Sequence, residues 1–343
     1  MTNNTSSTKI SSEKFNQTLS YIKNVQHPDG AIPWFEGGKL DPWDHTEAVM
    51  ALAIGDEIDA AKRGLDWLAS NQLEDGSWLA HYFAQEEVTA LRETNFVAYV
   101  ATGVWHLYLI TQDVDILKTY QSMVSRAISF VLRYQTEEGD IAWAVNEAGQ
   151  GEPDALLTAC CSILRSLECA IKLQNTLGAP HLNWTKSAKK LSDAILSKPD
   201  RFDRTWESKS RFAMDWYYPV LAGLYTTQEA QKVLNDRWQA FVEPELGCRC
   251  VSDEPWVTMA ETCELVIALV AADQKEKALA LFQTLEQWRD EDGGYWTGYV
   301  FKDKTVWPAE KTTWTAGAVL LAADALHTLT PAHHLFTSPL DLK

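Results

Sequence analysis

The chain has 343 residues, with 47 acidic and 30 basic side chains and a formal net charge of −17. This excess of acid argues against binding to nucleic acid or to an anionic membrane surface, because both are bound mainly through Lys and Arg. No stretch approaches the roughly 18 apolar residues of a transmembrane helix, and residues 1–12 lack the apolar segment of a signal peptide. We therefore expect a cytoplasmic protein without nucleic-acid partners. The oligomeric state stays open.

Apolar periodicity predicts twelve helices of two alternating kinds. Helices of the first kind carry mixed charge on one face and should face solvent; they lie near residues 12–25, 57–71, 114–135, 185–197, 227–242 and 274–289. Helices of the second kind are rich in Ala, Leu and Val and should be buried; they lie near residues 45–54, 93–111, 154–177, 214–225, 257–271 and 312–328. Six such pairs predict an all-α fold, a single (α/α)6 toroid with inner and outer rings over residues 12–329. Residues 1–11 and 330–343 are predicted to be flexible or loosely packed tails.

A short phrase recurs between the helices, with Gln72-Leu-Glu-Asp75-Gly76-Ser-Trp78 as its fullest form and further versions at 26–30, 135–143 and 290–296. Gly allows the positive φ that a reversal at a helix end requires. Asp favours a turn, and Trp can anchor the loop on the helices. Repetition every few dozen residues is typical of a helical repeat protein. The phrase therefore predicts the fold more directly than any activity.

This phrase, followed by an Ala- and Leu-rich helix, resembles the repeats of the terpene cyclase and prenyltransferase superfamily, which includes squalene–hopene cyclases. The resemblance spans about residues 20–328 and implies acid–base chemistry on an isoprenoid in a central cavity. It also implies that Asp44 takes the place of the proton-donating Asp in the cyclase D-x-D-D-T motif, with His45 at the next Asp. The late repeats lack the Asp, Cys and His set with which prenyltransferases hold zinc. We therefore expect no metal and no cofactor.

Carboxylates occur at the predicted start of every inner helix, and Trp lies beside them in four of the six. Capping of the helix explains any one carboxylate, but it does not explain the aromatic neighbours. Converging carboxylates in an aromatic cavity suit acid–base chemistry, because burial and crowding separate their pKa values. The predicted catalytic residues are Asp44, His45, Asp154, Asp215, Glu261 and Glu310. The predicted substrate-binding residues are Trp43, Glu47, Trp216, Tyr217, Arg249, Trp256, Glu264, Trp307 and Trp314.

The substrate is a small molecule, and its class stays open between two chemistries. The main prediction is protonation of an isoprenoid, with aromatic rings stabilising the carbocation. The alternative is an (α/α)6 glycoside hydrolase or polysaccharide lyase acting on an oligosaccharide, in which Asp44 pairs with Asp215, or Asp154 with Glu261. In that case the 15 Trp and 11 Tyr residues would supply flat surfaces for sugar rings. A third possibility is a non-catalytic toroid that binds a ligand or partner.

Overall fold

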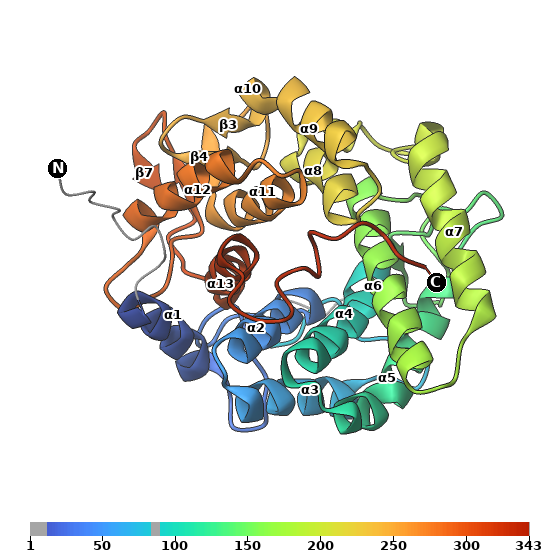
Figure 1. Cartoon of the computed structure of the whole chain (residues 1–343). Helices are drawn as coiled ribbons and strands as arrows, with labels where there is room; N and C mark the ends of the chain where they lie inside the picture. Colours follow the sequence, from blue (N-terminus) through green and yellow to red (C-terminus); the bar gives the residue numbers. More distant parts are fainter. Residues whose placement is uncertain (1–11, 84–89, 343) are drawn as a thin grey trace.

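A computed structural model, which describes residues 12–83 and 90–342, shows two concentric rings of helices (Figure 1). The inner ring contains α2 (Pro42–Ile54), α4 (Thr94–Thr111), α6 (Leu157–Thr176), α8 (Ala213–Leu221), α11 (Met259–Ala271) and α13 (Thr313–His327). The outer ring contains α1 (Ser12–Val25), α3 (Ile58–Asn71), α5 (Val114–Leu132), α7 (Leu182–Ser197), α9 (Thr227–Asp236) and α12 (Lys275–Gln283). Consecutive inner helices pack on one another, and α13 packs against α2 to close the ring. The predicted (α/α)6 toroid is confirmed.

The repeated phrase joins each helical pair to the next. Gln72 donates one hydrogen bond to the carbonyl of Gly76 and another to the carbonyl of Met123 on the next outer helix, both 2.9 Å long. Gly76 has φ +95°, and a β-carbon there would lie 2.4 Å from the carbonyl oxygen of Arg126. Glycine is therefore required by the contact between repeats as well as by the turn. It lies four residues beyond Gln72, which caps α3, and not directly at the helix end as we predicted.

The last copy of the phrase closes the toroid in the same way. Gly293 has φ +90°, and a β-carbon there would lie 2.5 Å from the backbone of Gln17 on α1. Thr18 donates its hydroxyl to the carbonyl of Gly293 at 2.9 Å. The last copy of the phrase therefore docks on the first helix through the contact that joins successive repeats elsewhere.

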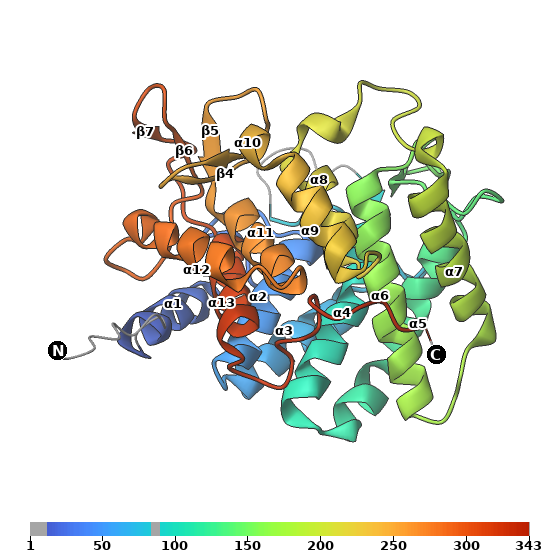
Figure 2. The same cartoon turned by 45° about the horizontal axis from the view of Figure 1, so that its top comes forward.

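Short strands interrupt the helical pattern at one end of the ring. An antiparallel five-stranded sheet contains β3 (Val242–Glu243), β4 (Gly247–Arg249), β5 (Trp256–Thr258), β6 (Gly298–Val300) and β7 (Thr305–Val306) in that order. A second pair joins β1 (Arg92–Glu93) to β2 (Ala144–Val145). Since β5 leads directly into α11, the sheet rises from the end where the inner helices begin (Figure 2). Strands of two or three residues are too short to show a recognisable alternation in the sequence.

Two predicted outer helices are broken near their ends. The helix predicted over 227–242 stops at Asp236 and is followed by the short α10 (Trp238–Phe241) and then by β3. The helix predicted over 274–289 changes after Gln283 into the 3-10 helix η3 (Thr284–Trp288). Both breaks lie in the pairs on either side of the five-stranded sheet, where the chain leaves the ring.

The C-terminal segment crosses the opposite end of the ring, in front of the helices in Figure 1. Arg165 of α6 is buried and donates to the carbonyls of Leu221 and Ser338, each at 2.9 Å. Leu340 donates its backbone N–H to the carbonyl of Gly223 at 3.0 Å. The predicted N-terminal tail, residues 1–11, lies outside the described residues. Within the described ranges, no helix is both long and apolar enough to span a membrane.

Candidate active site

The inner helices begin around a cleft of about 520 Å3. Its polar lining comes from four neighbouring helix starts and the loops before them, and includes Lys39, Asp41, Asp44, Glu93, Thr158 and Asp215. Its apolar lining includes Trp34, Trp43, Phe96, Phe212, Met214 and Trp314. The cleft thus combines carboxylates with aromatic rings, as the helix starts predicted.

The start of α2 places two carboxylates side by side. Asp41 is the N-cap, and one of its oxygens accepts a 2.9 Å hydrogen bond from the backbone N–H of Asp44. Pro42 follows at the first helical position, where a missing N–H costs nothing. The other oxygen of Asp41 accepts a 2.9 Å bond from the indole of Trp34. Asp41 is therefore held as a hydrogen-bond acceptor, while Asp44 lies in the first turn beside it.

Burial raises the pKa of Asp44 well above its usual value, and the negative charges of Asp41 and Glu47 raise it further. Lys39 acts in the opposite direction. Burial also raises the pKa of Asp41, but the bonds from Asp44 N–H and Trp34 stabilise its ionised form. When the pair holds a single proton, we place that proton on Asp44. Asp44 is therefore a carboxylic acid that can donate a proton into the cleft.

Asp215 and Glu93 line the cleft together with Asp41 and Asp44, whereas Glu261, at the start of α11, is not among its lining residues. Asp215 lies in the first turn of α8, which is three positions from α2 along the inner ring and so lies across the cleft. Thr158 donates a 2.6 Å hydrogen bond to Asp215, which opposes the rise in pKa that burial causes. Glu261 lies in the first turn of α11, is buried, and is hydrogen-bonded to the thiol of Cys250. Burial raises the pKa of Glu93 to about 7.

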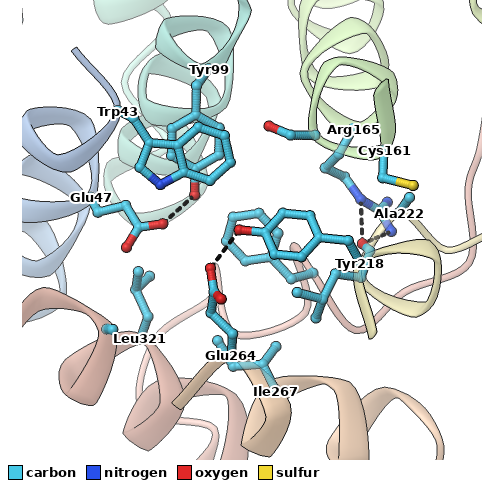
Figure 3. A pocket seen from close by; sticks show the side chains of 14 residues that line it. Trp43, Glu47, Tyr99, Cys161, Arg165, Tyr218, Ala222, Glu264, Ile267 and Leu321 are labelled. Carbon is cyan, nitrogen blue, oxygen red and sulfur yellow. Dashed lines mark hydrogen bonds between the residues drawn. The ribbon is translucent and has the colours of Figure 1, made fainter. Parts of the chain in front are cut away.

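A second layer of polar side chains lies one helical turn deeper. Residues three positions apart share a helix face, so Glu47 lies below Asp44, Tyr218 below Asp215 and Glu264 below Glu261. These three deeper residues and Tyr99 line a small inner cavity (Figure 3). The cavity has about 30 Å3 of space, enough for roughly one or two water molecules. It is too small to hold a substrate.

Tyrosine hydroxyls donate hydrogen bonds to the carboxylates of this inner cavity. Tyr99 donates its hydroxyl to one oxygen of Glu47 at 3.0 Å, and Tyr218 donates to one oxygen of Glu264 (Figure 3). Tyr217 donates to the other oxygen of Glu264. Burial raises the pKa of Glu47 to about 7. Burial and the nearby charge of Glu47 raise the pKa of Glu264 well above its usual value. These side chains form a hydrogen-bonded floor beneath the cleft.

Trp43 separates the two layers and lines both spaces. Its ring stacks on Tyr99 with centroids 4.2 Å apart and planes 8° from parallel. Because Tyr99 is in turn bonded to Glu47, the deeper layer fixes the orientation of the indole. One face of Trp43 is thus held rigidly by the core.

The structure divides the predicted site residues between these two layers and places others elsewhere. Those in the cleft are Trp43, Asp44, Asp215 and Trp314, and those in or bonded to the deeper layer are Glu47, Tyr217 and Glu264. His45 is buried and turned away: its Nδ1 accepts from the N–H of Ile32 at 3.1 Å, and its Nε2 lies 2.9 Å from the carbonyl of Gly64. Burial lowers the pKa of His45 to about 4, so the ring is neutral and joins α2 to its surroundings.

Asp154 and Trp216 also point away from the cleft. Asp154 accepts from the backbone N–H and the hydroxyl of Thr205, at 2.6 and 2.8 Å. Burial acts to raise the pKa of Asp154, but these bonds outweigh it and the pKa is lowered. Trp216 stacks on Phe241 and donates to the carbonyl of Val233 at 2.9 Å, so it packs towards the outer ring.

The remaining predicted residues lie in and beside the five-stranded sheet. Arg249 pairs with Glu243 and donates to the carbonyl of Ser252, which makes it part of a loop network. Trp256 and Trp307 pack edge to face, with centroids 5.2 Å apart. Glu310 precedes α13; burial raises its pKa and the charge of Lys39 lowers it.

Several cleft residues were not predicted: Trp34, Lys39 and Lys209 lie in connecting segments, whereas Phe212 is the N-cap of α8 and was overlooked there. Trp34 and Lys39 come from the loop that precedes α2, and the Lys39 ammonium lies 3.9 Å from the Trp34 ring. Lys209 comes from the connection between α7 and α8. Trp34 and Lys39 lie within ten residues of Asp44, so a wider window before that helix would have included them.

Solved structures of a D-mannose isomerase and of a glycosidase share this fold. The isomerase matches with a TM-score of 0.71 over 92% of this chain and 96% of its own, at 12% identity. The glycosidase, in complex with glucose, also matches with a TM-score of 0.71, over 93% of this chain and 97% of its own, at 12% identity. Likeness at this identity establishes the fold alone.

Sequence comparison identifies the class. No model of a known protein family matches the chain. The MMP endo-(1,4)-3-O-methyl-alpha-D-mannosidase of Mycolicibacterium hassiacum is 45% identical over 327 residues, which cover 95% of this chain and 90% of that enzyme. The fold, the acidic cleft and this likeness define a carbohydrate-active enzyme. Within that class, the chain belongs to the same family as the mannosidase.

The predicted resemblance to terpene cyclases and prenyltransferases was therefore wrong, and with it the isoprenoid substrate. The glycosidase alternative is the better supported. The repeated phrase on which the resemblance was based has a structural role in the packing of the toroid. Gln72 forms a hydrogen bond to the next repeat, and Gly76 lies where a side chain would clash with that repeat. Such a phrase marks a way of packing helical pairs and carries no information about the reaction in the cleft.

Proposed function

We propose that the protein is a glycoside hydrolase that cleaves internal (1,4) linkages between 3-O-methylated α-D-mannose units. The observation that carries this proposal is the 45% identity, over nearly the whole chain, to an enzyme of that activity. A cleft with protonated and ionisable carboxylates supports it independently, since glycosidic bonds are hydrolysed by a pair of such groups.

The apolar wall of the cleft supports a methylated sugar. Leu156, Ala159, Phe212 and Met214 lie together at the starts of α6 and α8. A methyl ether has lost the donor of a hydroxyl group, so it gains more from apolar contact than from hydrogen bonding. One additional methyl group in a fitted apolar pocket is worth roughly 10- to 200-fold in kcat/KM. This wall therefore supplies a basis for preferring methylated over free mannose units.

We assign the acid to Asp44. It transfers its proton to the glycosidic oxygen while the bond between that oxygen and the anomeric carbon breaks. A carboxylate on the other side of the ring, Asp215 or Glu261, takes a proton from water, and the water oxygen bonds to the anomeric carbon. The products are two shorter saccharides, one with a new hydroxyl and one with a new reducing end.

The position of α8 across the ring from α2 favours inversion at the anomeric carbon. An inverting enzyme needs room for a water molecule between its two carboxyl groups, whereas a retaining enzyme holds them closer together. An acid and a base on opposite walls meet the first requirement. The α-linked substrate should then release a β-configured reducing end.

The test uses purified protein with α-(1,4)-linked oligosaccharides of 3-O-methylmannose and with unmethylated counterparts of the same length. We expect cleavage within the methylated chains, weaker activity on the unmethylated ones, and a β-anomer as the first product by NMR. Asp44→Asn serves as the control for contaminating hydrolases. Absence of cleavage by the wild type, or equal cleavage by Asp44→Asn, would refute the proposal.

A further inference from the structure

We infer that Trp256 and Trp307 form an outlying saccharide-binding site that holds the part of a long substrate extending beyond the cleft. This inference rests on the proposed function, because it concerns the same polymer and the same face of the molecule. It adds a second substrate-binding region, which the proposed reaction does not itself require.

The two indoles are held in a fixed arrangement. The indole N–H of Trp256 donates a 2.9 Å bond to the carbonyl of Trp307, and the backbone N–H of Trp307 donates a 2.9 Å bond to the carbonyl of Gly298. A β-carbon on Gly298 would lie 2.4 Å from the Trp256 nitrogen, so glycine leaves the space that this ring occupies. Trp307 is nevertheless 56% exposed. The backbone of Trp307 is thus fixed by the sheet, and its ring packs edge to face on the hydrogen-bonded indole of Trp256 while it stays open to solvent.

The site lies on the cleft side of the ring and is tied to the cleft wall. Strand β5, which carries Trp256, leads into the start of α11, and the segment after Trp307 leads into the start of α13. In that segment Thr313 donates its N–H to the carbonyl of Trp34 at 2.7 Å and its hydroxyl to the carbonyl of Pro33 at 2.8 Å. Trp34 lines the cleft. A saccharide leaving the cleft past Trp34 therefore approaches the tryptophan pair.

The chemistry fits a sugar chain. An indole face stacks on the C–H face of a pyranose ring, and its N–H end remains polar. O-methylation makes the sugar more apolar and strengthens such stacking. A stable protein–protein interface buries about 800 Å2 on each partner, which is more than two indole rings supply. An enzyme that cuts within a polymer, in contrast, has sugar units on both sides of the reacting bond to hold.

The test compares Trp307→Ala with the wild type on methylated mannose oligosaccharides of increasing length. We expect kcat/KM to be unchanged for the shortest chain that the wild type cleaves and to fall about three- to ten-fold for long chains, as the loss of one aromatic contact predicts. The matched control is Leu182→Ala: Leu182 is 74% exposed and begins the outer helix α7, at the other end of the ring. It should leave kcat/KM unchanged at every length.

Equal kcat/KM for Trp307→Ala and the wild type at all lengths would overturn the inference, and so would a loss that is the same at all lengths. Binding of a long methylated mannan, measured by calorimetry with both proteins, decides the matter even if the wild type cleaves none of the chains. Weaker binding by Trp307→Ala then supports the site, and equal binding refutes it. Failure of cleavage alone counts against the proposed function and not against this site.

Discussion

The two polar layers of the inner ring contain similar residues on the same helices, yet they differ in what their carboxylates can do. Asp44 and Asp215 open onto a cleft of about 520 Å3, whereas Glu47 and Glu264, one turn deeper, face about 30 Å3. Both oxygens of Glu264 are occupied by tyrosine hydroxyls. Burial raises the pKa in both layers, so a raised pKa does not by itself mark a catalytic acid. Access for the substrate separates the two.

The deeper layer has a positioning role in this comparison. Trp43 lies between the layers, stacked on Tyr99, which is bonded to Glu47. The charge of Glu47 also raises the pKa of Asp44. The lower residues therefore act on the cleft through geometry and charge, without touching the substrate.

The largest expected difference between the layers is kinetic. Asp44→Asn removes the proton donor, and we expect kcat to fall about 100- to 10,000-fold, the usual range for a general acid. Glu47→Gln, one turn deeper, keeps an acceptor for Tyr99 and should change kcat less than about ten-fold. Steady-state kinetics on a methylated oligosaccharide measures both. Similar losses for the two variants would remove the distinction between the layers.

The second difference concerns stability. Tyr218→Phe keeps the ring but removes a buried hydrogen bond to Glu264, so we expect the free energy of unfolding to fall by about 1–3 kcal/mol. The matched control is Tyr134→Phe, whose hydroxyl donates to the carbonyl of Gly149 at the exposed surface. It should cost less than about 0.5 kcal/mol. Denaturant unfolding measures both. Equal losses in the free energy of unfolding would show that a hydrogen bond in the inner cavity contributes no more than one at the surface.

The third difference is in the pH dependence of stability. The pKa of Glu47 is about 7 in the folded protein and 4.5 as an ordinary glutamate, so between these values the folded state holds a proton that the unfolded state has released. The contribution of Glu47 is therefore present below pH 4.5 and is lost as the pH rises through 7. Glu47→Gln cannot ionise, so its free energy of unfolding should exceed that of the wild type at pH 8 by about 3 kcal/mol, while the two are similar near pH 4.5. Parallel stability curves over this range would contradict the assigned pKa.

The sequence was sufficient to predict the two rings of helices, but it predicted the candidate site only in part. Helix periodicity and the Gln72–Gly76 phrase predicted the toroid because packing between repeats is local and recurs. The carboxylates Asp44 and Asp215 followed from their places at helix starts. His45 was misjudged because its rotation towards Gly64 depends on tertiary contacts. Lys209 was missed because it reaches the cleft from the connection between α7 and α8, which has no regular pattern. Phe212 was missed although it directly precedes α8.

The smallest expected effect is a shift in the pH profile of kcat/KM, which tests whether Asp215 is the general base. The bond from Thr158 stabilises the ionised form of Asp215, so Thr158→Val should raise the pKa of Asp215, by up to about one unit. A base must be ionised to accept a proton from water. If Asp215 is the base, the acidic limb of the pH profile of kcat/KM moves to higher pH in the variant, while the alkaline limb, governed by Asp44, stays in place. An unmoved acidic limb would exclude Asp215 and leave the role to Glu261, for which Glu261→Gln is the direct test. Either result connects one hydrogen bond in the cleft layer to one proton in the reaction.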